Sequence, residues 1–306
     1  MDRRKFIQNA GLLLTASLIK PTLIHSLERI TEPEQWRKPK ELDGLYLKLA
    51  QDIKENKPII FTTYLGLWSE GKSPEDNLYW GKLYGHHEMF NRAKKDFHIR
   101  KNFQNHNWNR IHSEESKKDP LRTVVYNLKV KPNNFWKNLG IKRDFNIKQI
   151  YLVYEDIRKA GMDLTLHLKQ DQAKIIQTSS GKIDLGNESR IMGYNGHNYY
   201  YDGDFQEPHN VEKTSEKTKA IYCLSCKSRD FFGHVWTGKN IYGLLFTTSF
   251  MAPEGYNLLS LIDSVAQGQS GKKIIKQSNQ AYRYFQKLGG QKTPGNLFVN
   301  HSKGLF

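Results

Sequence analysis

A histidine and a cysteine each follow a segment that is predicted to be a β-strand. His197 comes shortly after the apolar segment 190–194, and Cys226 directly follows the segment 219–225. Ligands of open α/β sheets bind beyond the carboxyl ends of the strands. If the two strands are neighbours, the imidazole and the thiol therefore lie at one edge of the sheet. A neutral imidazole can remove the proton of a thiol, and the resulting thiolate is a strong nucleophile.

The residues around this pair fit nucleophilic chemistry. Lys227 and Arg229 place positive charge beside Cys226, which favours the thiolate. Gly196 lets the backbone turn sharply and approach a substrate closely. The alternative is that Cys226 is an inert buried cysteine and that His197 is a turn histidine bonded to backbone, because cysteine is among the residues most often buried.

The order of these elements resembles that of the caspase, gingipain and legumain-type cysteine peptidases. A strand leading to a histidine beside a glycine (IMGYNGH, ending at His197) precedes a strand leading to a cysteine (AIYCLSC, ending at Cys226). The resemblance covers residues 190–250 and implies a caspase-like fold. It also implies that His197 is the general base or acid and that Cys226 is the nucleophile.

The chain departs from those peptidases around the histidine. In that family a glycine after the histidine and the backbone N–H of the cysteine help to form the oxyanion hole. Here Gly196 precedes the histidine, Asn198 follows it, and the small residue Ser225 precedes the cysteine. The resemblance therefore implies substrate-binding or oxyanion-binding roles for Gly196, Asn198 and Ser225.

Four short segments also resemble those of a bacterial protein family, a likeness that implies no particular activity. They are Asn77-Leu-Tyr-Trp-Gly81, Gly196-His-Asn198, Cys226-Lys-Ser228 and Met251-Ala-Pro-Glu-Gly-Tyr256.

The remaining cysteine and histidine patterns favour neither redox nor metal chemistry. Cys223 and Cys226 form a C-x-x-C pair, but residues three apart on a strand face opposite sides, which resists a disulfide. The triplet 86–88 (His-His-Glu) has no i,i+4 pair and no H-E-x-x-H motif, so we interpret its histidines as surface residues. Glycine-rich phosphate loops and the G-x-S-x-G motif are missing from the sequence. We therefore predict no metal and no cofactor.

The N-terminus has the pattern of an export signal. Arg3 and Arg4 precede an apolar stretch over residues 10–19, and the Arg-Arg-x-Phe-Ile core resembles the twin-arginine consensus. We expect residues 1–25 to be a twin-arginine signal peptide read by the twin-arginine translocation machinery. The alternative is a basic terminus followed by a short core helix. With the signal, the mature protein would be periplasmic or otherwise exported, with no stable membrane anchor after cleavage.

The chain is basic, with a formal net charge of +16. Such a charge attracts acidic partners, among them nucleic acid, anionic lipid and polyanionic cell-wall polymers. The lysines are scattered through the sequence and no nucleic-acid-binding signature occurs, so a solvated lysine-rich surface is favoured and no nucleic-acid partner is expected.

Alternating apolar segments and helical patterns predict an α/β fold. We expect a mostly parallel six-stranded sheet with helices on both faces, and residues 26–306 as a single caspase-like domain. The expected strands are 58–64, 122–128, 147–154, 190–194, 219–225 and 240–248, and the expected helices include 73–84, 155–173, 255–267 and 271–288.

These patterns lead to three hypotheses about function. The first is an exported cysteine hydrolase, peptidase-like, in which Cys226 attacks a carbonyl of a peptide or protein substrate and His197 transfers the proton. The second is a catalytically silent binding protein on the same scaffold. The third is a basic envelope protein that binds acidic polymers.

Overall fold

The computed structural model describes residues 42–67, 73–178, 181–202, 215–237, 240–287 and 297–301. All of them belong to one compact unit, Lys40–Phe306. The predicted signal peptide, including Arg3 and Arg4, lies outside the described residues. Within the described ranges, none of the helices combines the length and apolar character needed to span a membrane.

A mixed sheet of eight strands forms the centre of this unit, in the order β10-β9-β8-β7-β1-β4-β3-β2. The five strands from β9 to β4 run parallel, whereas β10, β3 and β2 are antiparallel to their neighbours. The strands are β1 (Ile59–Gly66), β2 (Asn109–Glu115), β3 (Arg122–Val130), β4 (Phe145–Tyr154), β7 (Ile191–Gly196), β8 (Lys219–Leu224), β9 (Ile241–Thr247) and β10 (Phe298–His301). A separate hairpin pairs β5 (Ile175–Thr178) with β6 (Gly181–Asp184).

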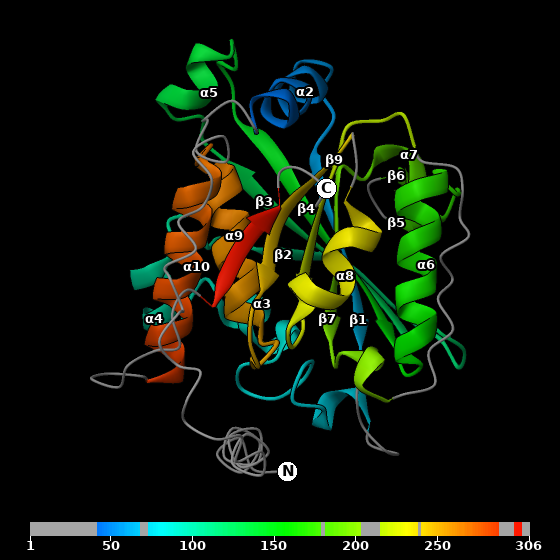
Figure 1. Ribbon diagram of the computed structural model, residues 1–306. Coiled ribbons are helices and arrows are strands. Elements are labelled where there is room, and N and C mark those ends of the chain that lie inside the picture. Colours follow the sequence, from blue (N-terminus) through cyan, green and yellow to red (C-terminus); the bar gives the residue numbers. More distant parts are fainter. Residues whose placement is uncertain are drawn as a thin grey trace, which may run out of the picture. The chain divides into compact units, whose positions relative to one another are not determined.

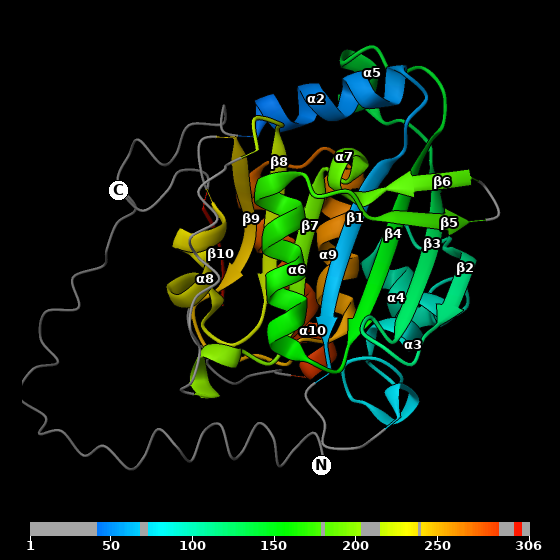
Figure 2. The same cartoon turned by 90° about the vertical axis from the view of Figure 1, so that its right-hand side faces the viewer.

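Helices lie on both faces of the sheet (Figure 1). Figure 2 shows α6 in front of the strands and α9 and α10 behind them. The α-helices are α2 (Asp43–Lys54), α3 (His86–Arg92), α4 (Phe97–Asn102), α5 (Asn134–Asn138), α6 (Ile157–Gln170), α7 (Leu185–Glu188), α8 (Ser228–Trp236), α9 (Gly255–Ala266) and α10 (Gly271–Gln286). Two short 3₁₀ helices cover Pro74–Asp76 and Tyr199–Asp202.

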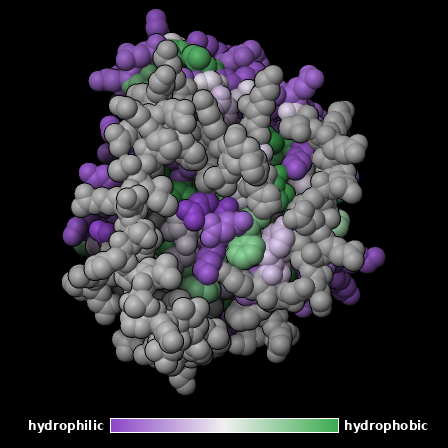
Figure 3. Space-filling view, in the orientation of Figure 1, coloured by the Kyte–Doolittle hydropathy of each residue, from purple (hydrophilic) through white to green (hydrophobic). Residues whose placement is uncertain are grey.

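The central strands are buried on both faces, which explains their nearly continuous apolar sequences. Every residue of β1, β7 and β8 is buried. Alternate side chains enter two separate hydrophobic clusters: Phe61 of β1 packs with α9 and α10, while Tyr64 packs with α6 and α8. On the face shown in Figure 3, many hydrophilic side chains lie around α5 and α2.

The predicted α/β class is confirmed, but the sheet is larger and more mixed than the six strands expected. All six predicted strands are present, and β2 and β10 extend the sheet at its two edges. The sequence of β2 (NRIHSEE) is polar and mostly exposed, so it lacks the apolar pattern of a strand. The short strand β10 follows the last predicted helix, in a part of the chain where we predicted no strand.

The predicted helix over 73–84 is wrong. Helical structure there is limited to Pro74–Asp76, and the next helix begins at His86. Gly81 and Gly85 explain the difference, because the backbone folds tightly against itself at both. A Cβ at Gly81 would lie 2.1 Å from the Glu75 carbonyl oxygen, and one at Gly85 would lie 2.3 Å from that of Trp80.

A buried polar contact crosses three strands of the sheet. Thr63, Gly193 and Tyr222 lie in one row on β1, β7 and β8. The Tyr222 ring lies over Gly193, and its hydroxyl is 2.5 Å from Thr63 Oγ1. Gly193 makes this crossing possible because it has no side chain beneath the ring.

We predict that Gly193→Ala destabilises the protein by roughly 1–3 kcal/mol, the usual cost of overpacking a core. The added Cβ would lie 2.3 Å from the Tyr222 ring, between two strands that cannot separate freely. Urea unfolding measures the change. Gly44→Ala on α2 is the matched control, because its Cβ meets only the terminal hydroxyl of Tyr242. Equal stabilities for the two variants would contradict the packing argument.

Candidate functional site

The carboxyl ends of β1 and β7 meet at the point where the strand order reverses. From β1 the chain proceeds to β4 on one side, and β7 then pairs with β1 on the other side. Open α/β sheets bind ligands at such a switch point. Gly66 and Gly196 are the last paired residues of the two strands there. His197 therefore leaves the sheet at the position where this topology favours a ligand site.

The two glycines allow the strands to end in close contact. Gly196 has a φ of 149°, and a Cβ there would lie 2.6 Å from the Gly66 carbonyl oxygen. A Cβ at Gly66 would lie 2.6 Å from the hydroxyl of buried Tyr194. That hydroxyl donates a hydrogen bond of 2.8 Å to the His197 carbonyl and so fixes the turn after β7. Gly196 thus shapes the turn, while its predicted substrate contact stays a prediction.

Asn198 connects the turn after β7 with the turn after β8. Its buried side chain donates from Nδ2 to the Cys226 carbonyl at 2.7 Å and accepts from the Tyr200 backbone N–H at 3.1 Å. β7 and β8 are adjacent and parallel, as the sequence argument required. The structure therefore brings together the segments that carry His197 and Cys226. A direct contact between imidazole and thiol, and an oxyanion-binding role for Asn198, stay predictions.

The Cys226 thiol lies against the loop that follows β9. Its sulfur is 3.5 Å from the Met251 backbone nitrogen and 3.6 Å from the Met251 carbonyl oxygen. Burial raises the pKa of Cys226, although the Met251 N–H and the charge of Lys227 partly oppose this rise. The resting side chain is therefore a thiol, and nucleophilic chemistry would need a base to remove its proton.

A sharp turn links Cys226 to helix α8. Lys227 has a left-handed backbone with a φ of 48°, and α8 begins at the next residue, Ser228. Ser228 Oγ donates to the Cys223 carbonyl at 2.7 Å, which holds the helix start against the end of β8. The partial positive charge of a helix N-terminus favours a nearby thiolate over a thiol. The start of α8 therefore restores part of the thiolate stabilisation that burial removes.

Ser225 and Cys223 face the interior. Both are fully buried, and Ser225 Oγ lies 3.4 Å from Cys223 Sγ. Burial raises the pKa of Cys223 to about 12, so this thiol is unreactive at neutral pH. Both cysteines are free, and Cys226 lies in the turn after β8 while Cys223 lies within the strand. The predicted oxyanion role of Ser225 stays a prediction.

The interpretation of the 86–88 histidines as surface residues is wrong for His86, which is fully buried. Its Nε2 lies 2.8 Å from Asn195 Nδ2, and its Nδ1 lies 3.1 Å from the Tyr151 hydroxyl. Burial lowers the pKa of His86 to about 3, so the ring is neutral. His87 is half-buried, and its ring stacks on Trp80 at a centroid distance of 4.8 Å.

His86 was missed as a site residue because the i,i+4 argument tests only for metal ligands. The useful signal lay in the glycine just before it, since Gly85 turns the chain inward at the start of α3. Asn195, two residues before His197, contacts this histidine inside the sheet edge. His86 and Asn195 thus form a buried polar support beneath the candidate site.

The segment 77–85 contributes Tyr79 to the surroundings of the cysteine. Tyr79 and Trp80 are buried in the core, which is the packing role. Burial raises the pKa of Tyr79, and the neighbouring acidic groups of Cys226 and Glu254 add to that rise. Tyr79 therefore belongs both to the core and to the surroundings of the thiol. Glu254 is itself buried and accepts a hydrogen bond of 2.8 Å from Gln286 Nε2.

We predict that His86 makes the protein less stable in acid. Its folded pKa lies below its ordinary value of 6.5, so between about pH 6.5 and 3 the unfolded chain takes up a proton that the folded chain does not. Stability should fall in this window by up to about 1.4 kcal/mol per pH unit as the pH decreases.

The measurement is urea unfolding at several pH values, for the wild type and for His86→Gln. The difference isolates His86 from His87 and His167, whose pKa values burial also lowers, to about 4 each. The variant should lose less stability in acid than the wild type. Parallel pH dependences would show that His86 is not a buried neutral base.

Within the described residues, no group of three or more potential metal ligands comes together. No protein family, curated protein or solved structure matches this chain. A function therefore has to be inferred from the chemistry of the site, since a fold alone does not specify one.

Proposed function

We propose that this protein is an exported cysteine hydrolase, peptidase-like, with Cys226 as nucleophile and His197 as general base and acid. The observation that carries the proposal is the arrangement of two neighbouring parallel strands. β7 leads to His197, β8 leads to Cys226, and the amide of Asn198 bonds the Cys226 carbonyl at 2.7 Å. Export is proposed from the twin-arginine pattern at Arg3 and Arg4.

In the proposed reaction, the thiol attacks the carbonyl carbon of an amide or ester. The imidazole of His197 removes the thiol proton as the sulfur–carbon bond forms, and then gives it to the leaving amine or alcohol as the old bond breaks. A thioester on Cys226 remains. Water adds to that thioester, again with His197 as base, and the acid product leaves as the proton returns to sulfur.

Backbone groups are the best candidates for stabilising the oxyanion. Negative charge develops on the substrate carbonyl oxygen and requires hydrogen-bond donors aimed at that position. Asn198 already donates to the Cys226 carbonyl, so we assign it a positioning role for the cysteine turn. The caspase-type resemblance implies that the backbone N–H of Cys226 donates to the oxyanion. It also implies that the turn at Gly196 shapes the oxyanion site.

A caspase-like scaffold is the finer fold assignment within this proposal. Its support is the order of the parallel strands: counted along the chain, His197 follows the third of them and Cys226 follows the fourth. That is the order of histidine and cysteine on which the sequence resemblance depends.

A catalytically silent binding protein on the same scaffold is the second candidate. The observation that favours it is the environment of the Cys226 sulfur, which lies between the Met251 backbone nitrogen and carbonyl oxygen. Burial also raises the pKa of this thiol. In such a protein the Cys226 side chain would hold the loop after β9 close to the end of β8. The thiol would not react with electrophiles in the folded state.

We predict that peptide chloromethyl ketones label the folded protein at Cys226. Mass spectrometry of the intact chain and of its peptides gives the position and extent of labelling. Cys226→Ala should reduce labelling to background, whereas Cys223→Ala should leave it unchanged, because Cys223 is buried and its thiol is protonated.

A set of peptides with acidic, basic, aromatic and small side chains covers the unknown specificity. Labelling of Cys226→Ala to the wild-type level would end the hydrolase proposal. Labelling of Cys226 that appears only in denaturant would support the silent scaffold.

A further inference from the structure

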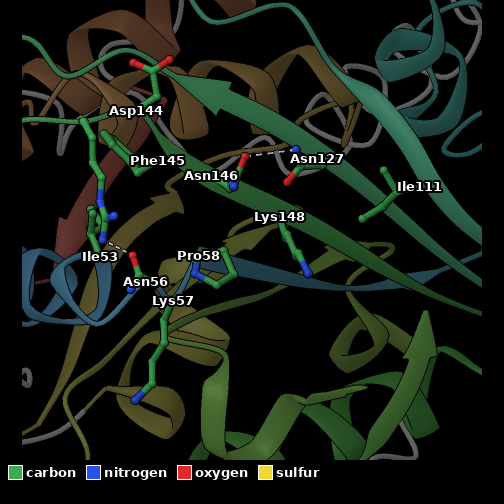
Figure 4. Close-up of a pocket in the computed structure, with 11 residues that line it drawn as sticks. Ile53, Asn56, Lys57, Pro58, Ile111, Asn127, Asp144, Phe145, Asn146 and Lys148 are labelled. Carbon is green, nitrogen blue, oxygen red and sulfur yellow. Dashed lines mark hydrogen bonds between the residues drawn. The ribbon is translucent and has the colours of Figure 1, made fainter. Parts of the chain in front are cut away.

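A cavity of about 520 Å³ opens at the amino ends of β1 and β4. It lies at the opposite end of the parallel strands from the turns that carry His197 and Cys226. The end of α2, the segment 56–58 that leads into β1, and residues of β2, β3 and β4 line it (Figure 4). Its volume falls within the ~300–1,000 Å³ typical of small-molecule sites.

The lining of this cavity carries an excess of positive charge. Lys57, Arg143 and Lys148 contribute three cations, and Asp144 contributes one acid. That acid already pairs with Lys129 at 3.3 Å, a residue outside the lining. Arg143 forms no ion pair with another described residue, and its guanidinium donates to the side-chain oxygen of Asn56. Lys57 pairs with Glu55 at 2.7 Å, so its charge is already balanced. An anion entering the cavity would therefore meet the Arg143 guanidinium without having to displace a carboxylate.

Lys148 is the most informative of these cations because the sheet holds it in place. It lies within β4, in register with Asn127 of β3 and Ile60 of β1. The residue is only half-exposed, and partial burial lowers the pKa of its ammonium group, an effect that the charge of Glu188 partly offsets. A partly desolvated ammonium gains more from an anion than a fully hydrated one does.

Amide side chains complete the lining beside these charges. Asn127 Nδ2 of β3 donates to Asn146 Oδ1 of β4 at 3.2 Å, and Figure 4 shows this pair next to Lys148. Asn56 lies across the cavity from them. Amides can both donate to and accept from hydroxyl groups, whereas guanidinium and ammonium groups match phosphate.

We propose that this cavity is a binding site for a phosphorylated sugar or polyol. Arg143 and Lys148 would hold the phosphate, and the amides of Asn56, Asn127 and Asn146 would bind the hydroxyl groups. The site is separate from the proposed hydrolase centre and does not depend on it.

Isothermal titration calorimetry of the full chain with glucose 6-phosphate, inorganic phosphate and glucose tests this site. Glucose 6-phosphate should bind more tightly than inorganic phosphate, and glucose should not bind measurably. Lys148→Met and Arg143→Gln should each weaken glucose 6-phosphate binding by about tenfold or more, the usual consequence of losing a charge-assisted contact.

Lys272→Met is the matched control, because it removes one positive charge from an exposed position on α10. It should leave binding unchanged, and unfolding midpoints should confirm that every variant is folded. Cys226→Ala should also bind normally, which separates this site from the hydrolase proposal. Three results would overturn the inference: no binding of glucose 6-phosphate, equal weakening by Lys272→Met, or inorganic phosphate binding as tightly as the sugar phosphate.

Discussion

The close contact between the ends of β1 and β7 is the constraint on which the candidate site depends. Gly66 and Gly196 meet there without side chains, and the space they leave is occupied by the hydroxyl of Tyr194. That hydroxyl holds the His197 carbonyl, so one tyrosine determines where the chain leaves the sheet. Any larger residue at either glycine would push the turn away from the switch point. The position of His197 is thus a consequence of packing within the sheet.

Three successive loops converge on this point, and each holds the next. The turn after β7 bonds the turn after β8 through Asn198 and the Cys226 carbonyl, and Cys226 in turn contacts the loop after β9 at Met251. The same packing that orders the thiol also partly buries it, and this burial raises its pKa. A reactive Cys226 therefore requires a base close at hand, because neither the start of α8 nor Lys227 fully offsets burial. This requirement makes His197 the central residue of the proposed chemistry.

The parts of the fold that were predictable from sequence are those buried on both faces. β1, β7 and β8 are largely apolar segments, and their order along the chain suggested neighbouring parallel strands. β2 was not predictable, because an edge strand with exposed polar residues carries no apolar period. Gly85 was the only local sign that His86 is buried, because the contacts of His86 with Asn195 and Tyr151 are remote in sequence.

The central claim is that the imidazole of His197 removes the proton of Cys226. The most direct measurement is the rate of Cys226 alkylation by chloroacetamide as a function of pH, in the folded wild type and in His197→Gln. Chloroacetamide is uncharged and small, so its rate reports thiolate reactivity and not peptide specificity. The account predicts that the wild type reacts faster near pH 7 and that the two rates converge at strongly alkaline pH, where the thiol ionises without help. Superimposable profiles over the whole range would contradict it.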